Sequence, residues 1–204
     1  MKTYDFENPY FIPWVGQDYF DIPPKLLILG ESHYARKEDL GKMEEPRLLT
    51  INCVRDYAYK KWNHSFFTRI SRIVSQKEAS QIDRTSFWAQ VAFYNYVQEI
   101  VGYNPRERPN ETQWNSSKDA LDEVLRKLTP NRVIILGKDL FYHLKESHFL
   151  SSVEEIPAEK NTYKEGIIKS GDFKGEFISI THPSSPHFGK VTSWYKPLKD
   201  FLQK

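Results

Sequence analysis

Residues 26–34, with the sequence LLILGESHY, decide the fold. An apolar run ends abruptly at Gly30 and is followed by the polar residues Glu31, Ser32 and His33. A buried parallel strand that opens into a ligand-binding loop has this pattern. Ligands in open α/β sheets bind just beyond the carboxyl ends of the strands, so we expect residues 30–34 to border a site.

A second stretch, residues 178–186 (ISITHPSSP), repeats this pattern far along the chain. It predicts a buried strand over residues 176–181 that ends before His182. Ser184 and Ser185 follow on a turn bounded by prolines, where hydroxyl and backbone N–H groups suit a phosphate. Together the two stretches predict one site built from two strand ends.

Two more apolar stretches complete the expected sheet. Residues 132–137 predict a strand that ends at Gly137, and residues 88–95 predict a strand that ends at Asn95, with a helix as the competing interpretation. The expected helices follow from apolar spacing, from Pro46 as a helix start and from a cap within residues 116–119. They cover residues 47–60, 66–74, 120–128, 140–145 and 193–202.

The remaining segments are expected to lack long regular elements. Residues 1–24 predict an N-terminal arm that packs without regular structure, residues 103–115 a loop, and residues 147–175 loops with short edge strands. Strands that alternate with helices favour a parallel sheet covered on both faces. We therefore expect one domain over residues 1–204, a three-layer α/β/α sandwich with a central, mainly parallel, four-stranded sheet.

Composition excludes several classes of protein. The chain has 204 residues, a formal net charge of +2 and one cysteine, Cys53. One cysteine excludes an internal disulfide and a multi-cysteine metal site. No metal and no cofactor are expected. The charge is too small for a protein that holds nucleic acid by charge alone. No apolar run reaches membrane-spanning length, and the first residues lack a signal-peptide core, so we expect a cytoplasmic location without a membrane partner. A monomer is expected.

The strand-end residues suggest chemical roles. Gly30 lets the backbone turn and a substrate approach, and Glu31 is suited to orienting or deprotonating a water. Asn95 offers a donor and an acceptor to a polar ring, and His182 suits the stabilisation of developing negative charge. Simpler interpretations remain open: Glu31 as a helix cap or a partner of Arg36, Asn95 as a turn residue, and His182 as a core histidine.

Four of these motifs, in order, resemble the uracil-DNA glycosylase superfamily. Residues 30–34 are similar to the family's first strand-end loop, and residues 93–95 to its strand that ends in a base-reading asparagine. Residues 133–137 resemble its third strand, and residues 182–184 its His-Pro-Ser loop. Residues 63–67 (NHSFF) also resemble an Asn-x-Phe-Trp segment of one branch, and the whole resemblance covers about residues 25 to 202.

The resemblance implies cleavage of an N-glycosidic bond in a base flipped out of DNA. It implies that Glu31 positions a water, with Ser32 as an assisting group, and that His182 stabilises the leaving base. Other side chains are implied to hold the substrate or to enter the duplex as a wedge. They are Gly30, Tyr34, Phe66, Phe67, Asn95, Ser184 and Ser185 for the substrate, and His187 and Phe188 for the wedge.

The chain departs from the family's motifs at several positions. Ser32 stands where the most active branch has aspartate, and His33 stands in place of a proline. Some branches carry glutamate at the position matched by Glu31, which makes Glu31 the residue on which activity depends. The cysteines that hold an iron–sulfur cluster in some branches are missing.

Two other functions fit the same residues. Serine esterases of the SGNH type would use Ser32 as nucleophile, His182 as base and Asn95 as oxyanion donor. Those enzymes carry an aspartate three residues before the histidine, where this chain has Ser179. The third alternative is a non-catalytic binder of nucleotides or nucleic acid on the same scaffold.

Overall fold

The fold is that of a computed structural model, which describes residues 5–35, 38, 41–42, 44–102, 107–158 and 162–204. Its strands are β1 Trp14–Val15, β2 Leu26–Gly30, β3 His33–Tyr34, β4 Val91–Asn95, β5 Ile100–Gly102, β6 Arg132–Leu136, β7 Leu150–Pro157, β8 Thr162–Ser170 and β9 Phe173–Ile180. Its α-helices are α2 Leu49–Ala58, α3 Ser65–Ser75, α4 Arg84–Ala89, α5 Glu111–Ser116, α6 Lys118–Leu128, α7 Lys138–Glu146 and α8 Tyr195–Leu202. No described helix is long and apolar enough to cross a membrane.

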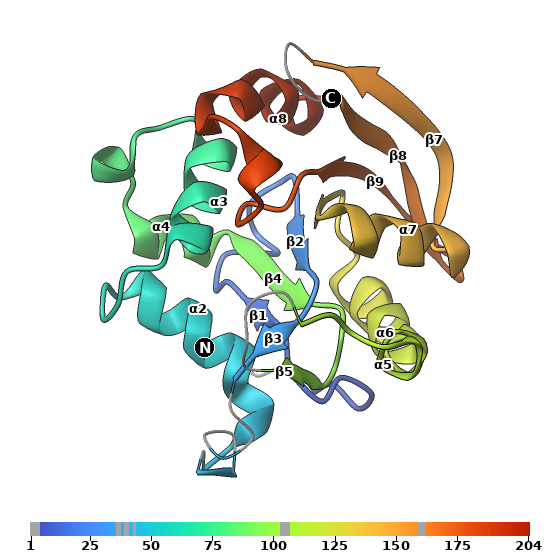
Figure 1. The fold of residues 1–204 in the computed structure, drawn as a ribbon. Coiled ribbons are helices and arrows are strands. Elements are labelled where there is room, and N and C mark those ends of the chain that lie inside the picture. Colours follow the sequence, from blue (N-terminus) through green and yellow to red (C-terminus); the bar gives the residue numbers. More distant parts are fainter. Residues whose placement is uncertain (1–4, 36–37, 39–40, 43, 103–106, 159–161) are drawn as a thin grey trace.

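The main sheet has seven strands in the order β1-β4-β2-β6-β9-β8-β7 (Figure 1). The four predicted strands are its contiguous parallel centre, β4-β2-β6-β9. The prediction of a four-stranded sheet is wrong in size and type, because β1 pairs antiparallel with β4 and an antiparallel hairpin extends the sheet beyond β9. The protein is therefore an α/β protein with a mixed sheet.

Residues 147–175 were expected to form loops with short edge strands, and the structure instead has two long strands there, which form the hairpin β7–β8 at the edge of the sheet. These strands are half exposed and rich in charged residues, so they lack the apolar runs of the four central strands. Gly166, a residue type that favours loops, lies inside β8. A Cβ atom there would lie 2.7 Å from the Ser151 carbonyl oxygen, so glycine marks the close approach of two strands rather than a turn.

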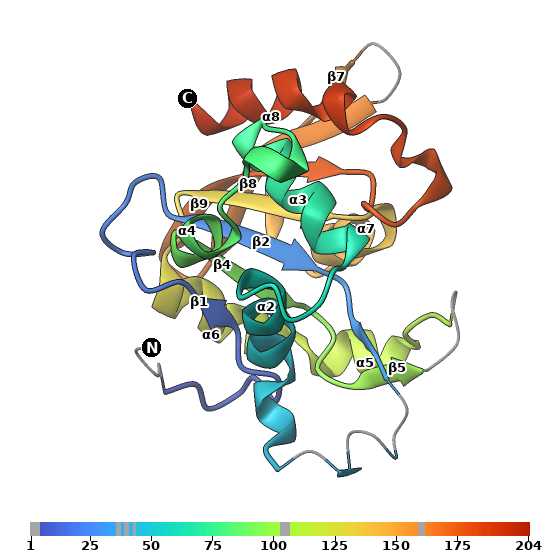
Figure 2. The ribbon, with the colours of Figure 1, turned by 90° about the vertical axis from the view of Figure 1, so that its left-hand side faces the viewer.

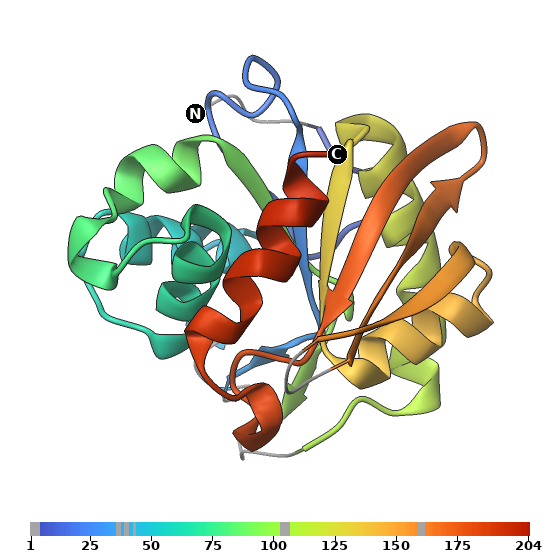
Figure 3. The ribbon, with the colours of Figure 1, turned by 90° about the horizontal axis from the view of Figure 1, so that it is seen from above.

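Helices cover both faces of the sheet (Figure 3). Alternate residues of β2 point to opposite faces: Leu27 and Leu29 join a core with α6 and α7, and Ile28 joins a core with α2, α3, α4 and α8. This alternation within an unbroken apolar strand is what burial on both sides requires. Both faces of the predicted three-layer arrangement are therefore occupied by helices.

Several expected boundaries change in detail. Residues 87–89 belong to α4 and residues 91–95 to β4, so the helix and strand interpretations of this stretch each hold for part of it. The predicted loop over 103–115 contains the start of α5, whose N-terminus is capped by the Asn110 side chain. Of that predicted loop, residues 103–106 lie outside the described residues.

Ser117 precedes α6, but its side chain does not cap the helix. The hydroxyl accepts a hydrogen bond from the backbone N–H of Gln98 and donates one to the carbonyl of Gln113. The expected cap is therefore wrong, because Ser117 is fully buried and joins three segments of the chain.

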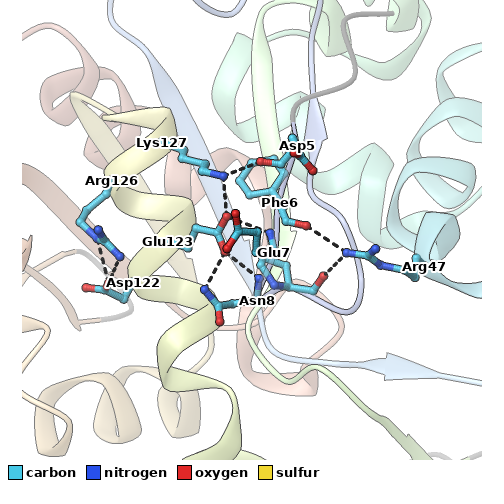
Figure 4. Close-up of polar contacts among 10 residues, drawn as sticks. Asp5, Phe6, Glu7, Asn8, Arg47, Asp122, Glu123, Arg126 and Lys127 are labelled. Atoms are coloured by element: carbon cyan, nitrogen blue, oxygen red, sulfur yellow. Dashed lines mark hydrogen bonds and ion pairs between the residues drawn. The ribbon is translucent and has the colours of Figure 1, made fainter.

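Of the N-terminal arm, residues 1–4 lie outside the described residues, and residues 5–24, apart from the short β1, pack without helices or strands as expected. Its anchor is the Glu123 carboxylate on α6, which accepts hydrogen bonds from the backbone N–H groups of Glu7 and Asn8 and from the Asn8 side chain (Figure 4). Lys127 lies 2.7 Å from the same carboxylate, and Arg47 donates to two carbonyl groups of the arm. We call this group of contacts the arm anchor.

Candidate active site at the carboxyl edge of the parallel strands

The four parallel strands end at one edge of the sheet (Figure 2). Gly30 at the end of β2 pairs with Asn95 at the end of β4, and the Gly137 N–H, just past β6, donates to the carbonyl of Ile180 at the end of β9. Glu31 directly follows β2, Gly137 directly follows β6, and His182 is the second residue after β9. The polar strand ends predicted from the sequence are thus brought together.

Gly30 and Asn95 fit against each other. A Cβ atom on Gly30 would lie 2.2 Å from the Asn95 side-chain oxygen, so only glycine leaves room for the amide. The amide nitrogen of Asn95 donates to the Ser32 carbonyl over 3.3 Å, and the residue is 7% exposed. Asn95 is therefore held at the strand end by the first strand-end loop.

Glu31 is a buried carboxylate with one cation, Arg108, against it among the described residues. The residue is 8% exposed, and its Oε2 accepts a hydrogen bond of 2.7 Å from the Arg108 guanidinium. Arg108 also pairs with Asp139, at the start of α7. Burial raises the pKa of Glu31, and Asp139 adds to the rise, while Arg108 opposes it.

His182 is half buried and neutral at pH 7. Its ring stacks on Phe66 with centroids 5.2 Å apart and an angle of 23° between the planes. Burial, assisted by the positive charge of Arg108, lowers the pKa of His182 to about 4. The Nδ1 atom accepts a hydrogen bond from the Ser184 N–H, so a neutral ring carries its proton on Nε2 as a donor.

Arg69 on α3 contacts the loop after His182 and holds it in place. Arg69 donates to the Pro183 carbonyl, and the guanidinium lies over the Phe188 ring, 5.8 Å from its centroid. Ser184 is exposed, whereas the Ser185 hydroxyl accepts from the His187 N–H. Of the two wedge candidates, His187 is exposed, but Phe188 is 1% exposed and stacks on Trp194 as a core residue.

Of the other aromatic candidates, one lies at the site, one belongs to the hydrophobic core and one is exposed. Phe66 contacts His182, whereas Phe67 is 5% exposed and packs against Trp88 and Phe93. Tyr34 is 44% exposed, and its hydroxyl donates to the Glu107 carbonyl. Phe67 thus supports the position of Phe66.

Ser32 lies beside Glu31, and its hydroxyl favours the ionised form of that carboxylate. The Oγ atom is buried, and no hydrogen bond joins it to His182 among the described residues. His33 turns away from the site: it is buried, and its Nε2 lies 2.8 Å from the Thr50 hydroxyl. The pairing that a serine esterase needs is therefore not formed here.

Sequence reasoning missed Arg108. It lies in a mixed-charge stretch with Glu107, which is typical of a solvated surface, and nothing local marks it as a partner of residues 77 positions earlier. Its charge acts on both site residues, since it lowers the pKa of His182 and opposes the rise in that of Glu31. Only the folded chain reveals this role.

The sequence gives no significant match to models of known protein families or to curated proteins. The chemistry of the site is therefore argued from its own residues. Among the described residues no group of three or more histidine, cysteine, aspartate and glutamate side chains is placed to hold a metal ion. What the site presents is a carboxylate, a neutral imidazole donor, an amide and an aromatic face.

Proposed function

We propose that this protein hydrolyses the N-glycosidic bond of a base flipped out of a nucleic-acid strand, on a fold of the uracil-DNA glycosylase type. The observation that carries the proposal is that Glu31 and His182 follow strands that end at the same edge of the sheet, and that the charge of Arg108 acts on both. DNA is the proposed partner. The four central parallel strands and the motifs at their ends support the resemblance noted in the sequence.

The proposed reaction needs a water, a sugar carbon and a leaving base. The bond between the sugar carbon and the base nitrogen breaks, and its electron pair leaves with the base. The water oxygen bonds to the sugar carbon while its proton passes to the Glu31 carboxylate, which later releases it to solvent. Arg108 donates a hydrogen bond to Oε2 of Glu31, which leaves Oε1 to accept the hydrogen bond and then the proton of the water.

His182 acts on the leaving base in this proposal. A neutral ring with its proton on Nε2 can donate a hydrogen bond to a base oxygen as negative charge develops there, without carrying a positive charge itself. Phe66 stacks on the imidazole ring and fixes its orientation, and Asn95 offers its amide to the edge of the base. The Ser184 N–H keeps the proton on Nε2 by occupying Nδ1.

The test is release of a base from oligonucleotides that contain uracil, hypoxanthine or a mismatch, measured as alkali-labile strand breaks. We expect Glu31→Gln and His182→Ala each to reduce the rate by about 100-fold or more. Glu154→Gln, which changes an exposed carboxylate on β7, is the matched control and should leave the rate unchanged.

Two results would contradict the proposal. One is the absence of base release from all of these oligonucleotides. The other is release that persists at the wild-type rate in Glu31→Gln. Hydrolysis of activated acetyl esters that disappears in Ser32→Ala would establish the esterase instead.

A further inference from the structure

Residues 59–64, which join α2 to α3, form an exposed segment with the sequence YKKWNH. Tyr59 is 59% exposed and Trp62 is 38% exposed, and the two lysines between them are also exposed. Aromatic and basic side chains that alternate on a surface are typical of proteins that bind single-stranded nucleic acid. We call these residues the 59–64 segment.

The aromatic rings of this segment lead to the candidate active site. The Trp62 and His64 ring centroids are 4.8 Å apart, and those of His64 and Phe66 are 6.3 Å apart. Phe66 in turn stacks on His182. A line of four rings in contact therefore runs from the surface at Trp62 to the site.

Trp62 is held in place although it is exposed. Its indole N–H donates to the Cys53 carbonyl over 3.3 Å, and Arg84 donates to the Trp62 carbonyl and to the Asn63 side chain. A ring that is already fixed loses little conformational entropy when a base stacks on it. The indole thus offers a preformed stacking surface.

The charges beside Trp62 suit phosphate groups. Lys60 forms no ion pair within the part of the chain that the structure describes. Lys61 pairs with Asp56 over 3.2 Å, and both side chains are well exposed, so the pair is weak and can exchange partners. The 59–64 segment therefore combines two available ammonium groups with a stacking surface.

We propose that a single-stranded segment of nucleic acid follows the 59–64 segment away from the site, with one base on Trp62 and its phosphates near Lys60 and Lys61. The proposal rests on the proposed function, because it takes the nucleotide at His182 as the starting point of the strand. It adds a substrate class, an unpaired strand next to the reacting nucleotide.

Trp62 offers a direct signal of binding. The other four tryptophans, Trp14, Trp88, Trp114 and Trp194, are at most 5% exposed. Quenching of tryptophan emission by an oligonucleotide therefore reports contact at Trp62. We expect quenching by a 20-nucleotide thymidine oligonucleotide, with less quenching by a fully paired duplex of the same length.

Variants measure the contribution of each part by fluorescence anisotropy of a labelled oligonucleotide. Trp62→Ala should weaken binding by about tenfold to a hundredfold, since one stacked base is lost. The double variant Lys60→Gln/Lys61→Gln should reduce the slope of log affinity against log salt by about 1 to 1.5, since two phosphate contacts are lost. It alters only exposed charges, so it tests the proposal even where Trp62→Ala disturbs the fold.

Phe20→Ala is the matched aromatic control. Phe20 is 41% exposed and precedes the start of β2 at Leu26, whereas the site lies past the other end of that strand. Its substitution should leave affinity and quenching unchanged. An RNA oligonucleotide in the same titration shows whether the contact distinguishes the two sugars.

The outcomes separate this inference from the proposed function. Base release at the wild-type rate and wild-type affinity in both Trp62→Ala and the double lysine variant would overturn the inference and leave the proposed function standing. Quenching that depends on Trp62 without any base release would support the nucleic-acid contact and contradict the glycosylase chemistry. Binding of neither oligonucleotide would overturn the inference.

Discussion

Two buried carboxylates, Glu123 in the arm anchor and Glu31 in the candidate site, differ in what surrounds them. Both are under 10% exposed, and each has one cationic side chain within 2.7 Å. Hydrogen bonds from Lys127, two backbone N–H groups and Asn8 outweigh burial and lower the pKa of Glu123 to about 2. Burial instead dominates at Glu31 and raises its pKa.

The difference shows that one neighbouring cation does not by itself determine whether the pKa of a buried carboxylate is lowered or raised. Glu123 has enough donors to replace the water it loses on burial, so its charge stabilises the fold. Glu31 has one arginine, shared with Asp139, so its charge costs stability and remains available for chemistry. The arm anchor is a structural use of a carboxylate, and the strand edge has the features of a functional one.

The largest expected effect is on stability. Glu123→Gln should lower the free energy of unfolding at pH 7 by about 3 kcal/mol, because a pKa drop of about 2.5 units is lost at 1.36 kcal/mol per unit. Glu31→Gln should leave the same quantity within about 1 kcal/mol of wild type, or raise it. Urea unfolding at pH 7 measures both.

Asp119→Asn, an exposed carboxylate in the first turn of α6, is the control for the loss of a negative charge on that helix. It should cost less than about 1 kcal/mol. Equal destabilisation by Glu123→Gln and Glu31→Gln would remove the distinction between the two carboxylates.

A second test uses acid. The lowered pKa of Glu123 gives stability that is present above the unfolded value of 4.5 and is lost as the pH falls toward 2. Glu31 has the opposite sign, because a raised folded pKa means that protonation relieves a cost. Unfolding followed by circular dichroism from pH 5 to 2 should therefore give a flatter curve for Glu123→Gln than for wild type.

The buried His33 adds a loss of stability at higher pH to this acid profile. Burial lowers the pKa of His33 to about 4, so the folded state resists protonation and stability falls as the pH drops from 6.5 to 4. His33→Gln should flatten that phase and leave the lower one intact. A wild-type stability that stays constant from pH 6.5 to 4 would contradict this account.

A smaller effect is expected at the strand edge. Gly30→Ala should destabilise the protein by about 1 to 3 kcal/mol, because the new methyl group would overlap the Asn95 amide. Asn95→Ala in the same chain should recover part of that loss. Thermal unfolding of the two single variants and the double variant measures the coupling, and strictly additive losses would show that the two residues do not compete for space.

The smallest expected effect is a shift of two ionisations. Arg108→Met should raise the pKa of both Glu31 and His182, since each loses a nearby positive charge. Nuclear magnetic resonance titration of labelled glutamate carboxyl and histidine ring signals measures both. Arg126→Met, which removes an ion pair with Asp122 on α6, is the control. Unchanged pKa values of Glu31 and His182 in Arg108→Met would show that Arg108 does not influence them.

The central strands were predictable because they are buried on both faces. The apolar runs of β2, β4 and β6 end in glycine or asparagine, and that of β9 ends in Thr181 and His182. These ends mark both the strand and its polar terminus, and all four strands are found in one parallel group. The hairpin β7–β8 was not predictable in the same way. Its half-exposed strands carry mixed charges, and Gly166 resembles a loop residue although it serves a close strand contact.

For the candidate site, sequence gives the residues on the strands but not those that reach them from elsewhere. Gly30, Glu31, Asn95 and His182 follow the strand ends, whose meeting is a property of any parallel sheet. Arg108 and the 59–64 segment come from connections between elements, where no periodic pattern constrains the path of the chain. Phe67 and Phe188 were candidates on motif alone, and burial assigns them to the core.

The arm anchor also constrains the order in which the molecule can assemble. Glu7 and Asn8 bond to a side chain 116 and 115 positions further along the sequence. More than half of the 204 residues must leave the ribosome before that partner exists. The arm is synthesised before α6 and cannot dock until α6 has been made, and such distant contacts are the kind that slow the folding of a domain.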